Sequence, residues 1–133
     1  MNRSPAQFQQ ECLFCQRIRS GAVMARLGTA VAFDDGFPVT HGHCLIVPRR
    51  HTPDWFSMTD EELHDSRALI RMLADRIRQA DPTITGFNIG TNSGASAGQS
   101  VFHAHIHLIP RRDGDCPDPK GGVRGVIDGR RAY

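Results

Sequence analysis

Phe102-His103-Ala104-His105-Ile106-His107-Leu108-Ile109-Pro110 is a stretch in which histidine and apolar residues alternate strictly. In a β-strand, side chains two positions apart point to the same face, so this period predicts a strand over residues 101–109. The three imidazoles would share one face, and the apolar side chains between them would pack on a core. We therefore expect one face of this strand to be structural and the other to be chemical.

Three alternating histidines favour nucleophilic or acid–base chemistry. Imidazole titrates near neutral pH and can attack phosphorus and leave again, which divides a displacement into two easier steps. Polar outward residues of a half-buried strand are one alternative. A three-histidine metal centre is another, although neighbours about 7 Å apart on one strand face spread the nitrogens widely for a tetrahedral zinc ion.

A loop of small residues comes directly before the histidines, at positions 94–100. Its backbone amides can approach an anion closely, as in an oxyanion-type cradle. A Gly- and Ser-rich loop on its own is usually a flexible connection. Its position immediately ahead of three histidines indicates a phosphate-binding loop.

The rest of the chain predicts an α+β fold. Thr59 and Glu62 form a capping box that starts a long helix running to about Ala80, with an apolar stripe at Leu63, Ile70, Leu73, Ala74 and Ile77. A short helix is expected over residues 11–20, and further strands over 22–26, 29–33, 43–47 and 84–89. Five short strands around one long helix predict a mainly antiparallel sheet in a single domain over 1–133, with a core of about 11–112 and a C-terminal tail over 113–133.

Composition limits the partners of this 133-residue chain. With a net charge of only +2, the chain is not a strongly basic protein that binds nucleic acid or an anionic membrane through its overall electrostatic field. No apolar run approaches the roughly 20 residues of a membrane span, and the polar N-terminus carries no signal peptide. We therefore expect a cytoplasmic protein whose four cysteines are thiols or metal ligands rather than disulfides.

At this point the chain resembles the histidine triad, or HIT, family. The family's hallmark is a Gly-Gln-x-Val segment followed by three alternating histidines, here Gly98-Gln99-Ser100-Val101 and then His103, His105 and His107. The resemblance runs from about Cys12 to Arg111. It includes an upstream hairpin with Phe33, Asp35, Pro38, Gly42, His43, Leu45, Val47 and Pro48, and the pair Asn92-x-Gly94.

The resemblance implies an enzyme, a nucleotide hydrolase that forms homodimers and cleaves purine nucleotides at the α-phosphate. Dinucleoside polyphosphates and nucleoside phosphoramidates would be its substrates, and the product would be a nucleoside monophosphate. His105 would attack phosphorus to form a nucleotidyl-histidine, His107 would hold phosphate oxygens or the leaving group, and His43 would join the imidazole network. Relatives that transfer nucleotidyl groups carry glutamine at the third motif position, so His107 favours water as the acceptor.

The resemblance also implies a set of nucleotide-binding residues. Asp35 would bond the ribose hydroxyls, although it could equally be an ordinary turn aspartate next to Asp34. Asn88 lies off the family spacing, so Asn92 is the better asparagine. The full set is Phe33, Asp35, Asn92, Gly98, Gln99, Ser100, Val101 and His107.

In many bacterial relatives, a cysteine pair near the N-terminus binds structural zinc together with two histidines. The corresponding residues here are Cys12, Cys15, His51 and His103, a closed tetrahedral set that takes no part in the chemistry. A redox pair lacks the expected βαβ setting, whereas two half-buried cysteines without a metal remain an alternative.

Other functions and roles stay open at this point. The chain could be a nucleotide-binding or partner-interaction protein with incidental turnover, a nucleotidyl transferase, or a zinc-responsive module. Four arginines at strand ends could steer polyphosphate or could simply be solvated: Arg49, Arg50, Arg111 and Arg112.

Overall fold

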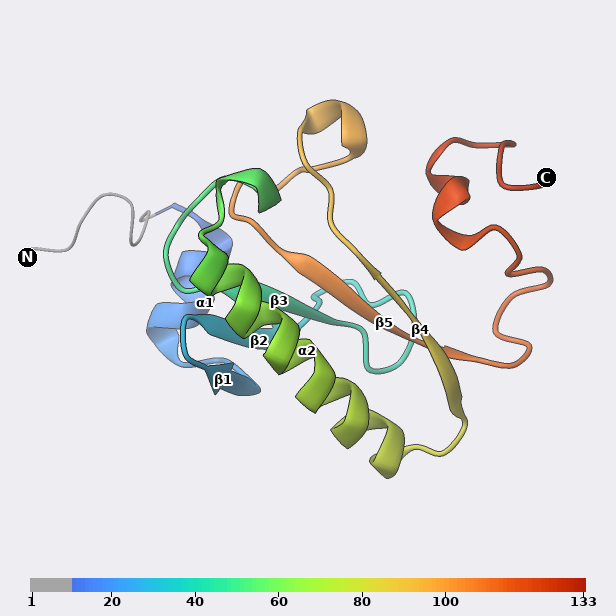
Figure 1. The fold of residues 1–133 in the computed structure, drawn as a ribbon, viewed down its shortest axis with the longest axis horizontal. Helices are drawn as coiled ribbons and strands as arrows, with labels where there is room; N and C mark the ends of the chain where they lie inside the picture. Colours follow the sequence, from blue (N-terminus) through green and yellow to red (C-terminus); the bar gives the residue numbers. More distant parts are fainter. Residues whose placement is uncertain (1–10) are drawn as a thin grey trace, which may run out of the picture.

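A computed structural model describes residues 11–133 and contains a five-stranded antiparallel sheet in the order β1-β2-β3-β5-β4 (Figure 1). The predicted α+β class, with one long helix and a short N-terminal helix, is confirmed. The elements are α1 (Leu13–Ser20), β1 (Ala25–Leu27), β2 (Ala30–Asp34), β3 (Cys44–Pro48), η1 (Trp55–Ser57), α2 (Asp60–Ala80), β4 (Ile84–Gly90), η2 (Ala95–Ala97), β5 (Ile106–Arg112) and η3 (Gly122–Val126).

Helices cover both faces of the sheet at its β2 and β3 strands. The long helix α2 lies diagonally across one face (Figure 1), where Leu69 and Leu73 pack against Ile46 and Leu108. The opposite face packs Ile18 of α1 against a second apolar cluster that includes Val31, Phe33, Leu45 and Val47. Strand β3 is buried along its whole length, which explains why its sequence is a continuous apolar run rather than an alternating one.

Helix α2 begins where the sequence predicted. The Thr59 side chain accepts a hydrogen bond from the Glu62 amide, and the Glu62 carboxylate accepts one from the Thr59 amide. The buried stripe differs from the predicted one, because it consists of Glu62, Ser66, Leu69 and Leu73, with Leu63 and Ile70 only partly buried. The buried face of α2 therefore includes two polar residues, Glu62 and Ser66, and Glu62 carries a charge.

The strand predicted over residues 101–109 is wrong in its position. β5 begins at Ile106. His103 and His105 lie in the segment before it, which does not pair with any strand of the sheet. The Ala104 amide donates instead to the carbonyl of Thr52 at 2.7 Å, so this segment bonds to a loop outside the sheet. Of the three histidines, His107 lies in the strand, paired with Leu45. Local bonds, rather than the pleat of one strand, therefore orient the imidazoles.

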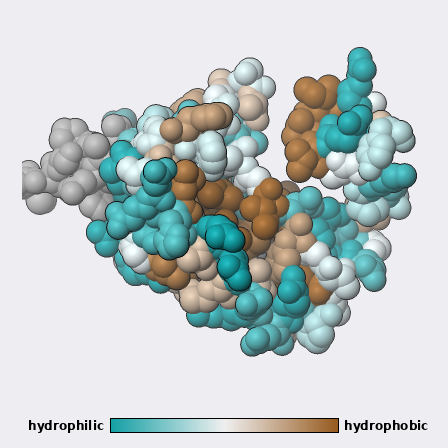
Figure 2. Space-filling view, in the orientation of Figure 1, coloured by the Kyte–Doolittle hydropathy of each residue, from teal (hydrophilic) through white to brown (hydrophobic). Residues whose placement is uncertain are grey.

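The C-terminal segment 113–133 leaves β5 and turns back beside β4, separated from the sheet by a hollow (Figures 1 and 2). Gly121 has a φ of 92° and lies against the backbone oxygen of Arg131, where a side chain would collide with it. In the part of the chain from residue 11 onward, no helix is long and apolar enough to span a bilayer. The polar N-terminus discussed above lies outside the described residues.

Candidate active site and metal centre

The backbone fixes which ring nitrogen of His105 carries the proton. Nδ1 of His105 lies 2.8 Å from the carbonyl oxygen of His103. A carbonyl can only accept, so Nδ1–H is the donor, and the lone pair of the neutral ring lies on Nε2. The Thr91 hydroxyl donates to the His105 carbonyl at 2.6 Å and holds the backbone at this residue. The arrangement provides a free imidazole nitrogen, which is what a nucleophile requires.

A second hydrogen-bond chain fixes His43 and His107. The Val39 amide donates to Nδ1 of His43 at 3.1 Å, so the proton of the neutral His43 ring lies on Nε2. That Nε2 lies 2.9 Å from Nδ1 of His107 and 3.3 Å from Oδ2 of Asp35. Since His107 then accepts at Nδ1, its own proton lies on Nε2. This series of hydrogen bonds leaves Nε2–H of His107 as a hydrogen-bond donor.

Burial keeps these two rings uncharged near neutral pH. Desolvation lowers the pKa of both His43 and His107, and for His107 the neighbouring histidines lower the pKa further. The carboxylate of Asp35 acts in the opposite direction on the pKa of each ring. The ring protons described above are therefore those of neutral imidazoles.

Asp35, His43 and His107 also bring three ligand atoms within 4.8 Å of one another, close enough to hold a metal ion. The hydrogen bond from Val39 opposes that use. A metal at Nε2 of His43 would require the proton to move to Nδ1, where it would face the Val39 N–H. The three side chains are therefore better arranged for hydrogen bonding to one another than for binding a metal cation.

A cavity of about 760 Å³ opens beside His105, and we call it the Phe33 pocket. Phe14 of α1 packs edge-on against the rings of both Phe33 and His105, with centroids 5.3 and 5.0 Å apart. Phe14 is a residue that the sequence reasoning missed, although its place inside the cysteine pair was a usable signal. The lining that bears on the sequence predictions is Phe33, Asp35, Asn92, Gly98, Ser100, Val101, His105 and His107.

Gln99 differs from the other expected binding residues because its side-chain amide is hydrogen-bonded to the backbone of the loop and of Pro53. Its Oε1 accepts the Gly94 N–H at 2.8 Å, and its Nε2 donates to the carbonyls of Pro53 and Val101. The side chain is buried and does not line the Phe33 pocket. Gly98 follows η2 with a φ of 94°, which a residue with a side chain rarely adopts. Gln99 therefore holds the conformation of the loop from its buried side, away from the Phe33 pocket.

The cysteine pair lies against two histidines. Sγ of Cys12 is 3.5 Å from Nδ1 of His103, and Sγ of Cys15 is 3.4 Å from Nδ1 of His51 and 3.5 Å from Nδ1 of His103. Nitrogen and sulfur ligands of a tetrahedral zinc ion, with bonds of about 2.0–2.1 and 2.3 Å, lie roughly 3.5 Å apart. These three distances match those of a tetrahedral zinc ion, and all four ligand atoms lie within 4.8 Å of one another, so the cluster is a candidate zinc site.

The His103 ring is prepared for such a role by its surroundings. Its Nε2–H donates to the Pro48 carbonyl at 2.8 Å, which leaves the lone pair of Nδ1 facing both sulfurs. Burial lowers the pKa of His103 to about 4 and also lowers the pKa of His51, so both rings are neutral and able to bind a metal at pH 7. No disulfide joins the four cysteines, all of which lie within the described residues.

Three of the four strand-end arginines form ion pairs within the protein. Arg50 pairs with Glu62, Arg111 with Asp115 and Arg112 with Asp81, at 2.8, 2.7 and 2.9 Å. Asn88 accepts from Arg111 rather than lining the Phe33 pocket. The structure therefore favours a structural role for these three arginines over polyphosphate steering.

Comparison with known proteins gives consistent matches. A family model of the HIT domain matches residues 19–114. Adenylylsulfatase HINT3 of Arabidopsis thaliana is 33% identical over 111 residues, which cover 81% of this chain and 56% of that protein. A HIT family protein from Bacillus anthracis superposes with a TM-score of 0.73 at 35% identity, covering 80% of this chain and 77% of that one. A Zn-bound histidine triad family protein from Mycobacterium smegmatis gives a TM-score of 0.71 at 33% identity, over 81% of this chain and 84% of the other.

Proposed function

The chain belongs to the HIT domain family, and on that premise we propose that it is a hydrolase that cleaves purine nucleotides at the α-phosphate. One observation carries the proposal: the free Nε2 of His105 belongs to a ring that lines a pocket large enough for a nucleotide. The similarity to a protein named an adenylylsulfatase supports hydrolase chemistry.

In the first step, Nε2 of His105 attacks the α-phosphorus of a nucleotide held in the Phe33 pocket. The bond from phosphorus to the leaving group breaks, and its electron pair goes to the leaving atom. His107 lines the same pocket, and its Nε2–H donates a hydrogen bond to that atom, which stabilises the negative charge that develops there. The hydrogen bond from His43 to Nδ1 of His107 stabilises the tautomer that presents this donor.

In the second step, water attacks the nucleotidyl-histidine. The P–N bond breaks, its electron pair returns to Nε2 of His105, the proton of the water goes to solvent, and a nucleoside monophosphate is released. Asn92, Gly98, Ser100 and Val101 line the region where the phosphate would lie, and Asp35 would accept hydrogen bonds from the ribose. Gln99 would act on the phosphate only through the loop that it holds.

The cysteine and histidine cluster would bind zinc through Cys12, Cys15, His51 and His103. When bound, the ion supplies no step of the reaction; as a closed site it would fasten α1 to the chain that carries His105. The similarity to a Zn-bound family member supports this assignment. The expected cytoplasmic location stays a prediction.

We also propose a homodimer that forms through β4. This strand lies at the edge of the sheet and carries Ile89, which is 52% exposed. An edge strand with an exposed apolar residue favours pairing with a second copy. Light scattering should give twice the chain mass; a monomer at micromolar concentration would contradict the proposal.

Incubation of the purified protein with adenosine 5′-phosphoramidate and diadenosine polyphosphates tests the activity, with release of AMP as the readout. His105→Ala should abolish release, because no other group supplies the attacking nitrogen. His41→Ala is the matched control, since that exposed histidine is absent from the lining of the Phe33 pocket. Activity that survives His105→Ala would refute the mechanism.

A further inference from the structure

A second cavity, of about 580 Å³, lies on the other side of His107, and we call it the Arg131 cavity. Its lining includes His107 and Asn92, which the Phe33 pocket also contains, whereas His105 lines the Phe33 pocket alone. His107 therefore lies on the boundary between the two. A molecule that passed His107 would occupy both cavities at once.

One wall of the Arg131 cavity comes from the C-terminal segment. Val123, Val126 and Arg131 line it and lie beyond residue 114, where the match to the HIT domain model ends. Val123 and Val126 are 67% and 75% exposed, and an apolar patch of the segment faces the hollow in Figure 2. Val39 and Ile109 supply apolar surface from the body of the protein. Residues of this chain that the family model does not cover thus build one wall of the cavity.

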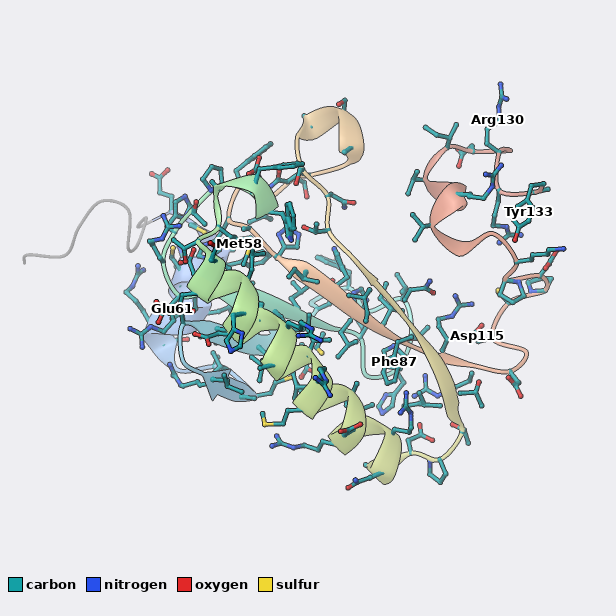
Figure 3. The ribbon with its side chains drawn as sticks, in the orientation of Figure 1. Met58, Glu61, Phe87, Asp115, Arg130 and Tyr133 are labelled. Carbon is teal, nitrogen blue, oxygen red and sulfur yellow. The ribbon has the colours of Figure 1, made fainter. Side chains whose placement is uncertain are left out.

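The charge inside the Arg131 cavity is positive. Arg111 is neutralised by Asp115, whose two oxygens accept from its Nε and Nη2 at 2.8 and 2.7 Å, with the label in Figure 3 marking Asp115 beside the end of β5. No carboxylate within residues 11–133 pairs with Arg131. An unpaired guanidinium between apolar walls suits a ligand that has an anionic group on an apolar or aromatic body.

We propose that the Arg131 cavity binds the leaving group of the reaction, and that this leaving group is a nucleoside diphosphate. The substrate class would then be dinucleoside polyphosphates rather than phosphoramidates of small amines. This inference rests on the proposed function. In a displacement the nucleophile and the leaving group take opposite sides of phosphorus. With His105 on the Phe33 side, the departing group lies on the side of His107 and Arg131.

The atoms balance for a dinucleoside triphosphate. Nε2 of His105 forms a bond to the α-phosphorus, and the bond from that phosphorus to the bridging oxygen breaks. The electron pair goes to the bridging oxygen, which becomes a terminal oxygen of the nucleoside diphosphate and accepts a hydrogen bond from Nε2–H of His107. Arg131 would bind the diphosphate, and the apolar walls would contact the second nucleoside.

The test compares kcat/KM for P1,P3-diadenosine triphosphate with kcat/KM for adenosine 5′-phosphoramidate, whose leaving group, ammonia, is too small to reach Arg131. Arg131→Met keeps the aliphatic stem that packs over Gly121 and Gly125 and removes the charge. We expect it to lower the ratio of the two constants about tenfold, as for loss of one charge-assisted hydrogen bond. Arg131→Lys should restore most of the ratio.

Arg130→Met is the matched control, because Arg130 lies at the far end of the C-terminal segment and does not line the cavity (Figure 3). An unchanged ratio in Arg131→Met, or an equal fall in Arg130→Met, would overturn the inference. Absence of AMP release from both substrates would instead refute the proposed function.

A binding experiment tests the cavity independently of turnover. Calorimetry titrates ADP into His105→Ala protein saturated with AMP, so that the Phe33 pocket is already filled. ADP should bind, and adding Arg131→Met should weaken its binding about tenfold. Failure of ADP to bind under these conditions would overturn the inference.

Discussion

Replacing Glu62 with glutamine tests how the buried charge of α2 contributes to stability. The Glu62 carboxylate is 4% exposed, and it accepts hydrogen bonds from Nε and Nη2 of Arg50 at 3.0 and 2.8 Å and from the Thr59 amide at 2.9 Å. Glutamine keeps the volume and one acceptor for Thr59. Its amide nitrogen, however, would face a donor of Arg50, and the charge would be lost.

The loss of stability in Glu62→Gln depends on how exposed Glu62 and Arg50 are. Breaking a fully buried ion pair costs about 3–5 kcal/mol, whereas a surface pair contributes about 0–1 kcal/mol. The Arg50 side chain is 34% exposed, so water recovers part of its loss and we expect about 2 kcal/mol. For a chain of this length, that lowers the melting temperature by roughly 7 °C.

The effect should disappear in acid. Burial alone would raise the pKa of Glu62, but the hydrogen bonds from Arg50 and Thr59 together with the Arg50 charge outweigh it, so the pKa is lowered. A carboxyl group whose pKa is lower in the folded state stabilises the protein above its unfolded pKa of about 4.3, and this stability is lost as the pH falls through the folded value. The difference between wild type and Glu62→Gln should therefore narrow below about pH 4.

Urea denaturation from pH 7 to pH 3 measures the difference. Glu61→Gln is the matched control, because Glu61 is an exposed residue of the same helical turn (Figure 3). Equal losses in Glu61→Gln and Glu62→Gln would refute the reasoning. A difference that persists undiminished at pH 3 would refute the assignment to the ionised carboxylate.

Two further predictions concern the site. Cys15→Ser should reduce the zinc content of protein purified without chelator, because it weakens one of four ligands; elemental analysis measures this, Cys44→Ser is the control, and undiminished zinc would contradict the assignment. Asp35→Asn should lower the pKa of His43 and of His107, because it removes the negative charge that raises both; NMR titration of the rings measures this, and unchanged values would show that Asp35 acts elsewhere.

The sequence predicted the fold well where short-range rules apply. The capping box of Thr59 and Glu62 and the apolar run of β3 both identified their elements, because each depends on neighbours in the chain. The start of β5 was mispredicted for the opposite reason. Alternation over residues 101–109 satisfies a strand, but the Ala104 amide bonds to Thr52, a partner about fifty residues away that no local pattern indicates.

The candidate site divides in the same manner. The histidines and cysteines were recognisable from spacing and resemblance, and the structure brings them together as two neighbouring clusters. The amide of Val39, which determines the tautomer of His43, could not be identified from residue types, because every residue except proline offers such an amide. The sequence did not single out Arg131 either, because only the folding back of the C-terminal segment brings this residue to the cavity.

His103 participates in two different structures through two different parts of the same residue. Its ring faces the sulfurs of Cys12 and Cys15, and its carbonyl receives the proton-bearing nitrogen of His105. Fixing the ring therefore fixes the peptide group that aims the nucleophile. A designer who replaced the cysteine and histidine cluster with apolar packing would have to keep the backbone of residue 103 in place, since a rotation of that single peptide would release His105 into its other tautomer.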